Sequence, residues 1–507
     1  MKKTILLALG ILLAGGISAQ EIMTANMLEI APQRHMINPA FEPQTEGYFI
    51  APVLSHTGAL IGNTSIGMND LIVNRNGTTM WTLNPEANYD LLGAFHKNTL
   101  VRAEVNTAIF GFGFRLPKGG YLHVNADLTA DAGANLPRTI FEFALDGGMK
   151  DLSGGSNITD ITQLGARAQA YLSLGAGYSK QKGDWGWGFQ VKLLDGIAYA
   201  GVRSKSLQMD TKADEWTLRG NGYMEIAAPF NPNLEEVLPS GPGYYDMERW
   251  SKQEKLFDWK NVGNLLTPCG YGAAVDLGVT YKPASFVKLS AAITDLGAIY
   301  WNRGRKLGYE ADGTYNGVGT IVYGDYTDEE GNFNGRQLWD TIETHLEDIY
   351  KTAFRSSDEY TCEEGNWQNG FLAPLTMKIN AGADFYLCRD IIGLGIYSRT
   401  LLHDSRLYEE LTIGAAVRPC KWFNFALSYS MMNGKWDNLG VAIGLRGGPV
   451  VLTLAADYVP MTWTHYTTES EKRIALPYKA KGVNAELGIA FVWGWKESKI
   501  TTETITY

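Results

Sequence analysis

The chain has 507 residues, and its 44 Lys and Arg against 54 Asp and Glu give a formal net charge of −10 and a pI near 5.4. A hydrophobic fraction of 45% excludes a largely disordered chain, and the acidic balance leaves no electrostatic footprint for nucleic acid. Length alone would allow several soluble domains, but the strand patterns described below favour one large unit. The 57 Gly, 26 Tyr and 14 Trp are typical of a β-rich protein.

Residues 1–19 have the three parts of a secretory signal peptide. A positive start is followed by an apolar stretch over residues 5–14, and small residues precede a cleavage site between Ala19 and Gln20. The alternative, an uncleaved anchor, is disfavoured because the apolar stretch is short. The first cysteine is Cys269, so no cysteine at the cleavage site could carry a lipid. The sequence predicts an exported protein that is not a lipoprotein.

Downstream of the signal peptide, no segment has the run of about eighteen apolar residues that a transmembrane helix needs. A periplasmic protein, a secreted protein and a β-barrel in an outer membrane remain, and strand patterning decides between them. In residues 163–179, apolar side chains fall on one face and mostly small or polar side chains on the other. The same alternation recurs in residues 271–282, 375–387 and 483–495.

Such strands are longer than those of most water-soluble sandwiches. Their polar faces consist largely of Gly, Ser, Thr, Asn and Gln, which suits a packed or hydrated lumen, and their apolar faces suit lipid. The sequence therefore predicts an all-β fold, a transmembrane antiparallel β-barrel of about fourteen strands in the outer membrane. We expect Val279 and Ala381 to face lipid, and Gln169 and Asn380 to face the lumen.

Short polar turns alternate along the chain with long connections, which is the asymmetry between the two rims of an outer-membrane barrel. Residues 230–268 and 302–373 are predicted as structured loop insertions. Within the second, apolar side chains at helical spacing predict an amphipathic helix over residues 338–353. Aromatic residues near strand ends predict an interfacial girdle made of Tyr121, Trp185, Trp187, Tyr281, Tyr386, Trp422, Phe423, Trp493 and Trp495.

The predicted organisation has four parts along the chain. They are the signal peptide 1–19, an N-terminal plug segment 20–46, the β-barrel 47–495 and a polar C-terminal tail 496–507. The plug segment is long enough to fold into the lumen, and the alternative is that it only caps the periplasmic rim. The plug and lumen candidates are Arg34, Asn38, Pro39, His123, Arg167, Lys378 and Asp384.

Three short segments resemble a known group of barrels. Residues 36–41 (Met-Ile-Asn-Pro-Ala-Phe) resemble the Asn-Pro-Ala motif near the start of many Bacteroidota outer-membrane barrels. Residues 275–281 and 293–297 are similar to the core of an uncharacterised barrel family of that phylum, a domain-of-unknown-function family. That family is similar in turn to barrels of the fatty-acid-transporter type, so the resemblance implies fourteen strands and an N-terminal plug. The polar tail after Trp495 departs from the usual barrel ending on an aromatic residue.

Three functions follow from these features. The leading hypothesis is a transporter or channel-like barrel for small molecules, with hydrophobic molecules favoured by the resemblance. The alternative is a structural or secretion-accessory barrel whose loops 230–268 and 302–373 dock partner proteins. An outer-membrane enzyme ranks third, because no catalytic set can be assembled from local sequence. The expected surroundings are outer-membrane lipid and lipopolysaccharide, with no nucleic acid partner.

The sequence predicts no metal site and no cofactor. None of the seven histidines has the spacing of metal ligands on a predicted helix. The Gly-x-Gly at residues 111–113 lacks the rest of a phosphate-binding loop. Acidic residues at 325–330 lack the full spacing of a calcium loop, and a solvated loop is the better interpretation.

The dipeptide Asp195-Gly196 lies between two β-like runs. It indicates a turn or bulge in the strand, and the transporter resemblance implies a sharper alternative, a wall kink that opens a lateral exit to lipid.

Four cysteines in an exported chain allow three disulfide pairings. Strand topology favours two of the possible disulfides, with four free thiols as the alternative. The favoured pairs are Cys269–Cys362 on the long-loop rim and Cys388–Cys420 on the short-turn rim.

Overall fold

A computed structural model describes most of the chain. The described residues are 22–50, 56–75, 78–82, 87–146, 157–212, 215–229, 267–316, 354–357, 368–388, 390–404, 406–432, 434–457, 459, 462–467, 473–478 and 481–495. The predicted signal peptide, the helix over 338–353, Cys362 and the tail 496–507 lie outside these residues.

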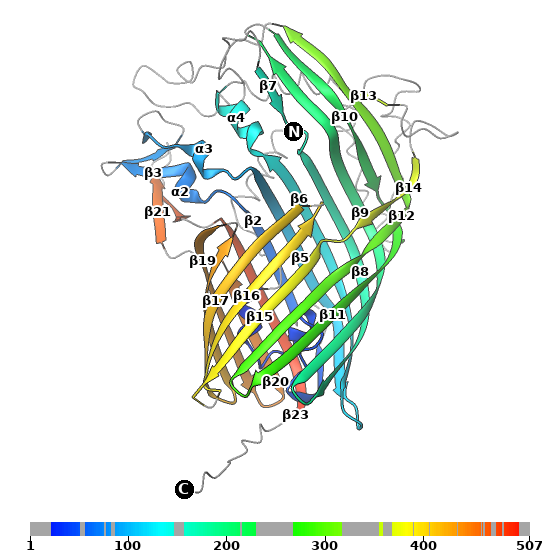
Figure 1. Cartoon of the computed structure of the whole chain (residues 1–507), viewed down its shortest axis with the longest axis vertical. Coiled ribbons are helices and arrows are strands. Elements are labelled where there is room, and N and C mark those ends of the chain that lie inside the picture. The colour runs from blue at the N-terminus through cyan, green and yellow to red at the C-terminus, as the bar shows by residue number, and fades with distance from the viewer. Residues whose placement is uncertain are drawn as a thin grey trace.

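Within the described residues, fourteen antiparallel strands close into one barrel (Figure 1). In order around the wall they are β1 (Thr45–Ile50), β5 (Asn98–Arg115), β6 (Tyr121–Pro137), β8 (Gly165–Lys182), β9 (Trp185–Thr211), β11 (Gly270–Ala284), β12 (Val287–Asn316), β15 (Met377–Leu387), β16 (Ile392–His403), β17 (Arg406–Cys420), β18 (Phe423–Met432), β19 (Lys435–Gly447), β20 (Val450–Asp457) and β23 (Gly482–Trp495). The ring closes where β23 pairs with β1, from Trp495 opposite Thr45 to Phe491 opposite Phe49. The predicted all-β barrel of about fourteen strands is confirmed.

Five more strands join the same sheet, and two small hairpins and several short helices lie apart from it. The added strands are β2 (His56–Asn63), β7 (Asn157–Asp160), β10 (Glu215–Ala227), β13 (Phe354–Ser356) and β14 (Gln368–Pro374). The hairpins are β3 (Ile72–Arg75) with β4 (Thr78–Trp81), and β21 (Thr462–Thr467) with β22 (Arg473–Tyr478). The helices are η1 (Met23–Met27), η2 (Pro32–Met36), α2 (Met68–Leu71), α3 (Leu91–Ala94) and α4 (Arg138–Asp146). No helix among the described residues is long and apolar enough to cross a membrane.

The wall strands expose apolar side chains and bury polar ones, the reverse of a water-soluble protein. On β9, Trp185 is 56% exposed and Leu193 is 62% exposed, while Gln190 between them is 1% exposed. The eight steps from Trp185 to Leu193 extend about 26 Å at about 3.3 Å per residue, and a tilt of about 40° makes this about 20 Å of height. The exposed apolar side chains of this one strand thus span most of the apolar band of a transmembrane barrel, which is about 25 Å tall. The predicted lipid face and lumen face agree with this pattern, since Val279 is 37% exposed and Asn380 is 8% exposed.

The lower end of the barrel in Figure 1 carries the short turns. Exposed aromatic side chains stand beside these turns in the sequence. Trp185, Trp187, Trp422 and Trp493 are all exposed and form part of the predicted girdle. The prediction is wrong for Tyr121, which is fully buried and points inward. Tyr386 also faces the lumen, where its hydroxyl donates to Glu29.

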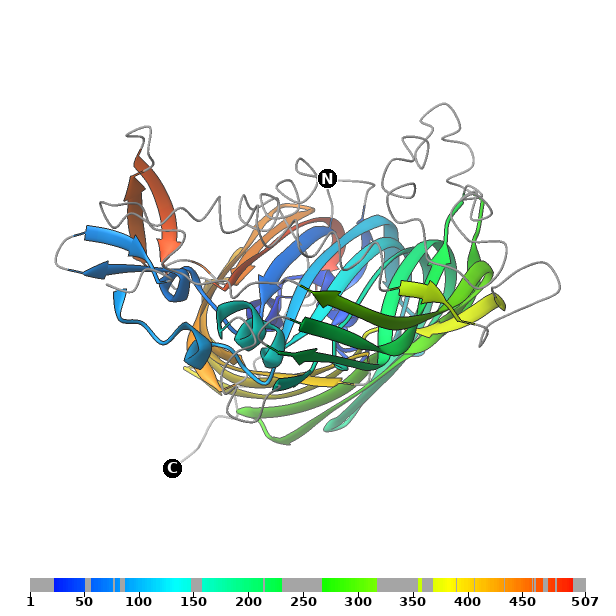
Figure 2. The same cartoon turned by 90° about the horizontal axis from the view of Figure 1, so that it is seen from above.

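The upper end is extended by strands that rise above the rest of the wall. β9 and β12 have 27 and 30 residues, and β10 pairs with both of them in the extension. Seen from above, the wall is a flattened ring with this sheet along part of its edge (Figure 2). The outward side chains of the extension are polar, for example Lys205, Arg219 and Asp312. We therefore place the extension outside the apolar band.

The extension corrects one predicted loop. Residues 302–316 continue β12 and residues 368–373 belong to β14, so the predicted loop 302–373 is shorter than expected. The reason is that β10 and β14 provide β12 with hydrogen-bonding partners on both sides beyond the apolar band. Of the predicted loop 230–268, only residues 267 and 268 are described.

Candidate functional site: the barrel lumen

The N-terminal residues 22–44, here called the lumenal segment, lie inside the lower half of the barrel. All of residues 22–28 are buried. The Thr24 hydroxyl donates to Asp457 Oδ1 on β20, and the Met23 amide donates to Asp457 Oδ2 at 3.1 Å. The upper part of the segment is thereby attached to the wall by two hydrogen bonds to a buried carboxyl group.

The middle of the lumenal segment is held by backbone groups of the wall. The Asn38 amide donates to the Ala291 carbonyl at 3.2 Å, and its oxygen accepts from the Ala40 amide at 2.9 Å. This close approach requires glycine in the facing strand, because a Cβ at Gly278 would lie 2.0 Å from Asn38 Oδ1. A Cβ at Gly188 would lie 2.2 Å from the Pro39 carbonyl oxygen. The predicted residues Asn38 and Pro39 therefore lie against the wall, inside the lumen.

Charged groups hold the lower end of the segment. Glu42 pairs with Arg115 at 2.6 Å, and Glu29 lies 3.7 Å from Arg418. Burial raises the pKa of the Glu29 carboxyl, but the positive charges of Arg418 and Arg34 outweigh this effect and bring the pKa to about 2. The predicted anchor Arg34 also stacks over the Phe41 ring, with 4.5 Å between its guanidinium carbon and the ring centroid.

A cavity lies directly above the segment, lined by Met36 and by side chains from opposite walls. We call it the charged cavity, because its lining includes Glu104, Asp127, Lys192, Asp276, Asp295 and Lys378. The volume of the cavity that the centre of a water molecule can occupy is about 40 Å³. Since one water needs at least about 10–15 Å³ by this measure, the cavity has room for about three.

Ion pairs connect the walls of the charged cavity. Lys192 lies 2.8 Å from Asp276 and 2.7 Å from Asp295, which joins β9, β11 and β12. Lys378 on β15 lies 3.2 Å from Asp295 and 4.0 Å from Glu104 on β5 across the lumen. Asp295 has φ +59°, a left-handed conformation that is costly for a residue other than glycine, and its amide donates to Asp276 at 2.8 Å. This local backbone strain is stored at the charged cavity.

Two other predicted lumen residues lie close to the segment. The His123 ring lies 4.2 Å from the His35 ring, centroid to centroid, and its Nε2 is 3.1 Å from Gln190. Asp384 is buried and accepts a hydrogen bond from the Tyr397 hydroxyl. Both residues are buried side chains of the wall strands.

A second connection crosses the lumen above the charged cavity, and we call it the upper bridge. Arg167 on β8 donates to the Pro374 carbonyl at 2.9 Å and to Thr376 at 2.5 Å, and it lies 3.3 Å from His403 Nδ1. The same guanidinium forms ion pairs with Asp404 at 3.3 Å and Asp131 at 3.9 Å. β8 is not a neighbour of β14, β15 or β16 in the wall, so these contacts cross the lumen rather than follow the sheet. A Cβ at Gly133 would lie 2.6 Å from His403 Nε2, so this glycine lets the imidazole reach the opposite wall.

A pocket with mostly apolar surface lies beside the upper bridge, near the mouth. Its apolar lining comes from Leu60, Leu100, Leu401 and Met432. The pocket also includes Arg102, which is 5% exposed and forms an ion pair with Glu104. The pocket lies at the level of the upper bridge, because Arg102 pairs with Gly133 in the β5–β6 register.

The wall is interrupted next to the predicted kink. On the side of β9 away from β8, β10 ends at Ala227, opposite Tyr199, and β11 begins at Gly270, opposite Gly196. Residues 197 and 198 of β9 therefore have no strand partner on that side. The β8–β9 register also shifts here, between Ala170 and Tyr171, which makes the predicted bulge correct. β9 itself continues past Asp195, so no turn occurs there.

Aromatic side chains fill this wall interruption. Trp301 is fully buried, and its ring centroid is 5.4 Å from that of Tyr199. Phe371 completes the group at 5.1 Å from Tyr199. A Cβ at Gly196 would lie 2.6 Å from the Trp301 ring, so the glycine makes room for the indole.

The cysteine predictions are partly corrected. Cys388 and Cys420 lie on short turns at the same rim, as expected, but both are free, so the predicted disulfide between them is not formed. Two strand steps, about 10 Å, separate the turns, and a disulfide needs Cα atoms within about 7 Å. Cys269 is free and buried, and its predicted partner Cys362 is outside the described residues.

Sequence reasoning placed Arg167 and Lys378 in the lumen but not their partners. It missed His403 in the upper bridge, Glu104 and Lys192 at the charged cavity, and Asp457 at the lumenal segment. The sequence did contain a signal that could have identified them as lumen residues, because each lies on the polar face of an alternating strand. What no local pattern carries is which of these faces meet across the lumen. Among the described residues, no cluster of His, Cys, Asp and Glu has the arrangement of a metal site.

Comparison with known proteins identifies the family. Residues 39–457 match the model of a family described as "Family of unknown function (DUF5723)". The chain belongs to this family. The matched region begins within the lumenal segment and reaches the end of β20, so it includes most of the lumen described above. No curated protein matches the chain.

Solved structures with a similar barrel have very different sequences. The toluene transporter TbuX of Ralstonia pickettii is 10% identical, with 92% of this chain and 94% of that chain covered and a TM-score of 0.38. The toluene transporter TodX of P. putida is 8% identical with the same coverage and the same TM-score. At this level of similarity, neither structure indicates what the present chain carries.

Proposed function

We propose that the protein is a gated channel for small molecules in the outer membrane, exported by a cleaved signal peptide. The observation that supports this best is that side-chain contacts cross the lumen at two levels, with a cavity between them. The contacts of the lumenal segment lie at the lower level and those of the upper bridge, centred on Arg167, at the upper one. Non-covalent contacts of this kind can separate without any change in the hydrogen bonds of the wall.

The two lumen compartments favour different solutes. The pocket near the mouth has an apolar lining that supports a hydrophobic substrate or a hydrophobic part of one. The charged cavity below it disfavours an apolar solute, because such a solute would displace water from Lys192, Asp276 and Asp295 without replacing their hydrogen bonds. A hydrophobic molecule that enters at the mouth therefore needs a second way out.

The wall interruption beside Asp195 and Gly196 is our proposed lateral exit. It lies at the top of the apolar band, and the side chains that fill it, including Trp301 and Phe371, are apolar. Movement of the Trp301 ring away from Gly196 would open a path from the lumen toward lipid. Polar solutes would instead cross the charged cavity and leave past the lumenal segment.

A second candidate function is docking of partner proteins. The polar extension of β9, β10 and β12 beyond the apolar band supports it, because this surface is available to macromolecules outside the membrane. An enzyme remains the third and weakest candidate.

Liposome flux tests the channel proposal. We compare the full mature chain, a deletion of residues 22–44, the double change Arg167→Ala with His403→Ala, and the combination of both. We expect little flux from either change alone and a clear increase in the flux of small solutes from the combination, because the two closures act in series. Heat-modifiable gel mobility verifies folding of each variant. A folded combination that stays sealed would refute the channel.

A further inference from the structure

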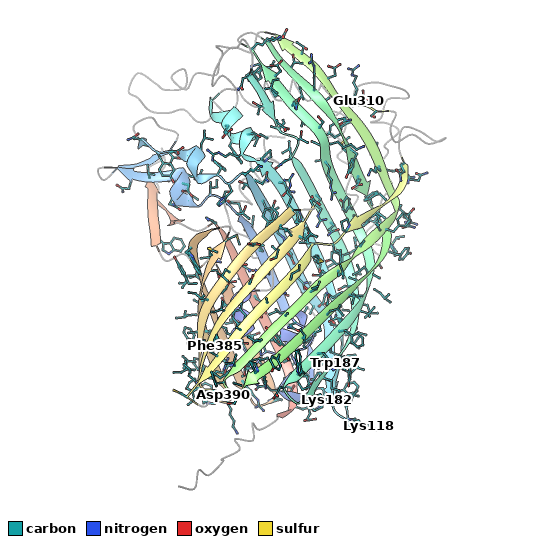
Figure 3. All side chains as sticks on the ribbon, in the orientation of Figure 1. Lys118, Lys182, Trp187, Glu310, Phe385 and Asp390 are labelled. Carbon is teal, nitrogen blue, oxygen red and sulfur yellow. The ribbon has the colours of Figure 1, made fainter. Side chains whose placement is uncertain are left out.

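The lower rim of the barrel carries exposed lysines on four of its turns, and we call these the basic rim: Lys118, Lys182, Lys282 and Lys421. Lys118 lies between β5 and β6, and Lys182 is the last residue of β8. Figure 3 labels Lys118 and Lys182 at the lower end of the barrel, far from Glu310 on the upper extension. The four lysines are thus distributed around one edge rather than gathered in one loop.

The short turns of this rim carry more lysines than carboxylates. Asp184 and Asp390 are the carboxylates on the described turns of this rim. No carboxylate of the described residues is within ion-pair distance of Lys118, Lys182 or Lys282. The rim is therefore positive although the whole chain has a net charge of −10.

Exposed aromatic side chains lie next to two of these lysines, Lys182 and Lys421. Lys182 pairs with Trp185 in the β8–β9 register, and Trp185 is 56% exposed. Trp422 follows Lys421 directly and is 58% exposed. Tryptophan side chains prefer the boundary between lipid chains and head groups, so each neighbouring ammonium group is held at the depth of the head groups.

The upper extension has no such arrangement. Its exposed side chains include both signs of charge: Lys205 and Arg219 are positive, and Glu310 and Asp312 are negative. The excess of lysine at the lower rim is therefore a local feature and is not shared by the exposed surface of the upper extension. It also means that the two leaflets of the membrane would meet different surfaces.

We propose that the basic rim binds the phosphate groups of anionic phospholipids in the leaflet that surrounds the short turns. Each lysine donates to phosphate oxygens, and the aromatic rings beside Lys182 and Lys421 lie at the glycerol level. One Lys near an anionic membrane surface contributes about 1 kcal/mol, which corresponds to about a fivefold change in affinity. The interaction is electrostatic, so it weakens as salt is raised.

Lipid titration measured by native mass spectrometry tests the proposal on the folded, detergent-solubilised chain. The probes are phosphatidylglycerol and phosphatidylcholine with the same acyl chains. The test variant changes the four basic-rim lysines to Gln. The matched control removes four exposed cations of the upper extension, by the changes Lys205→Gln, Lys212→Gln, Arg219→Gln and Arg303→Gln.

We expect tighter binding of phosphatidylglycerol than of phosphatidylcholine, loss of that preference in the basic-rim variant and its retention in the control. Each single Lys→Gln change gives about a fivefold loss at its own turn, which covers the case in which the fourfold variant does not fold. Equal affinity for the two lipids, or equal losses in the two variants, would overturn the proposal. So would displacement by millimolar inorganic phosphate, because the rim would then bind free phosphate.

Discussion

The sharpest test of the lumenal segment is the change Gly278→Ala. The new Cβ would lie 2.0 Å from Asn38 Oδ1 and 3.0 Å from the Ala40 amide, and real Cβ contacts essentially never fall below 3.0 Å. Asn38 must therefore move by about 1 Å, which breaks its hydrogen bond to the Ala291 carbonyl. Gly278 lies within β11, which pairs with β9 and β12 through backbone hydrogen bonds. The change to Ala therefore leaves these strand pairings in place.

The magnitude follows from the bonds that are lost. One or two hydrogen bonds at about 1 kcal/mol each, plus the steric shift, loosen the segment by about 2–3 kcal/mol. Such a change raises the detached population about 30- to 150-fold. Gly447→Ala is the matched control, because a Cβ there meets nothing within 4 Å and the residue has no positive φ.

Limited proteolysis of the lumenal segment measures its detachment from the wall. The barrels also carry Arg167→Ala, which opens the upper bridge. Cleavage within residues 22–44 should accelerate with Gly278→Ala and stay unchanged with Gly447→Ala. Single-channel recordings of the same proteins should show more frequent openings. Identical proteolysis rates for the two glycine variants would refute the role assigned to the Asn38 contact.

Three further outcomes are expected. Val191→Lys places a charge in the apolar band and should destabilise the barrel by about 2–4 kcal/mol, whereas Gln169→Lys faces Asp131 in the lumen and should be tolerated, as heat-modifiable gel mobility would report. Gly196→Val pushes on the buried indole beside it and should alter uptake of hydrophobic solutes; unchanged uptake of every solute tested would remove the lateral exit. The pKa of Glu29, about 2 against an ordinary 4.5, is depressed, so its contribution is complete above pH 4.5 and disappears as the pH falls through 2. In barrels that carry Arg167→Ala and His403→Ala, the change Glu29→Gln should therefore raise flux by the same factor at pH 8 and at pH 5. A factor that falls between these two values would contradict the ion pairs assigned to this carboxylate.

The wall could be predicted from sequence because its rule is local. A strand between lipid and a polar lumen must alternate, and residues such as Val279 and Asn380 follow that rule without knowledge of their neighbours. The upper extension escaped prediction for the same reason. Residues 302–316 lie outside the apolar band, so their outward face is polar, and with several charged and glycine residues the segment has the composition of a loop.

The lumen could be predicted only in part. Arg167, Lys378 and Asp384 were recognised as inward residues by their place on a polar face. Their partners depend on how far neighbouring strands are staggered and on which strands face each other after closure. Lys378 meets Glu104 from the other side of the barrel, 274 positions away in sequence, and no local spacing encodes that contact.

The attachment of Thr24 to Asp457 has a consequence for assembly. Thr24 precedes the first wall strand, and its partner lies 433 residues later on β20, next to the seam where β23 joins β1. The binding surface for the N-terminus is therefore completed among the last parts of the chain to be synthesised. Either the N-terminus waits inside the curved, unclosed sheet and is enclosed as the seam forms, or it threads in afterwards between the short turns. How long the seam between β23 and β1 stays open during insertion would then determine what fraction of newly made barrels contains the N-terminal segment in the lumen.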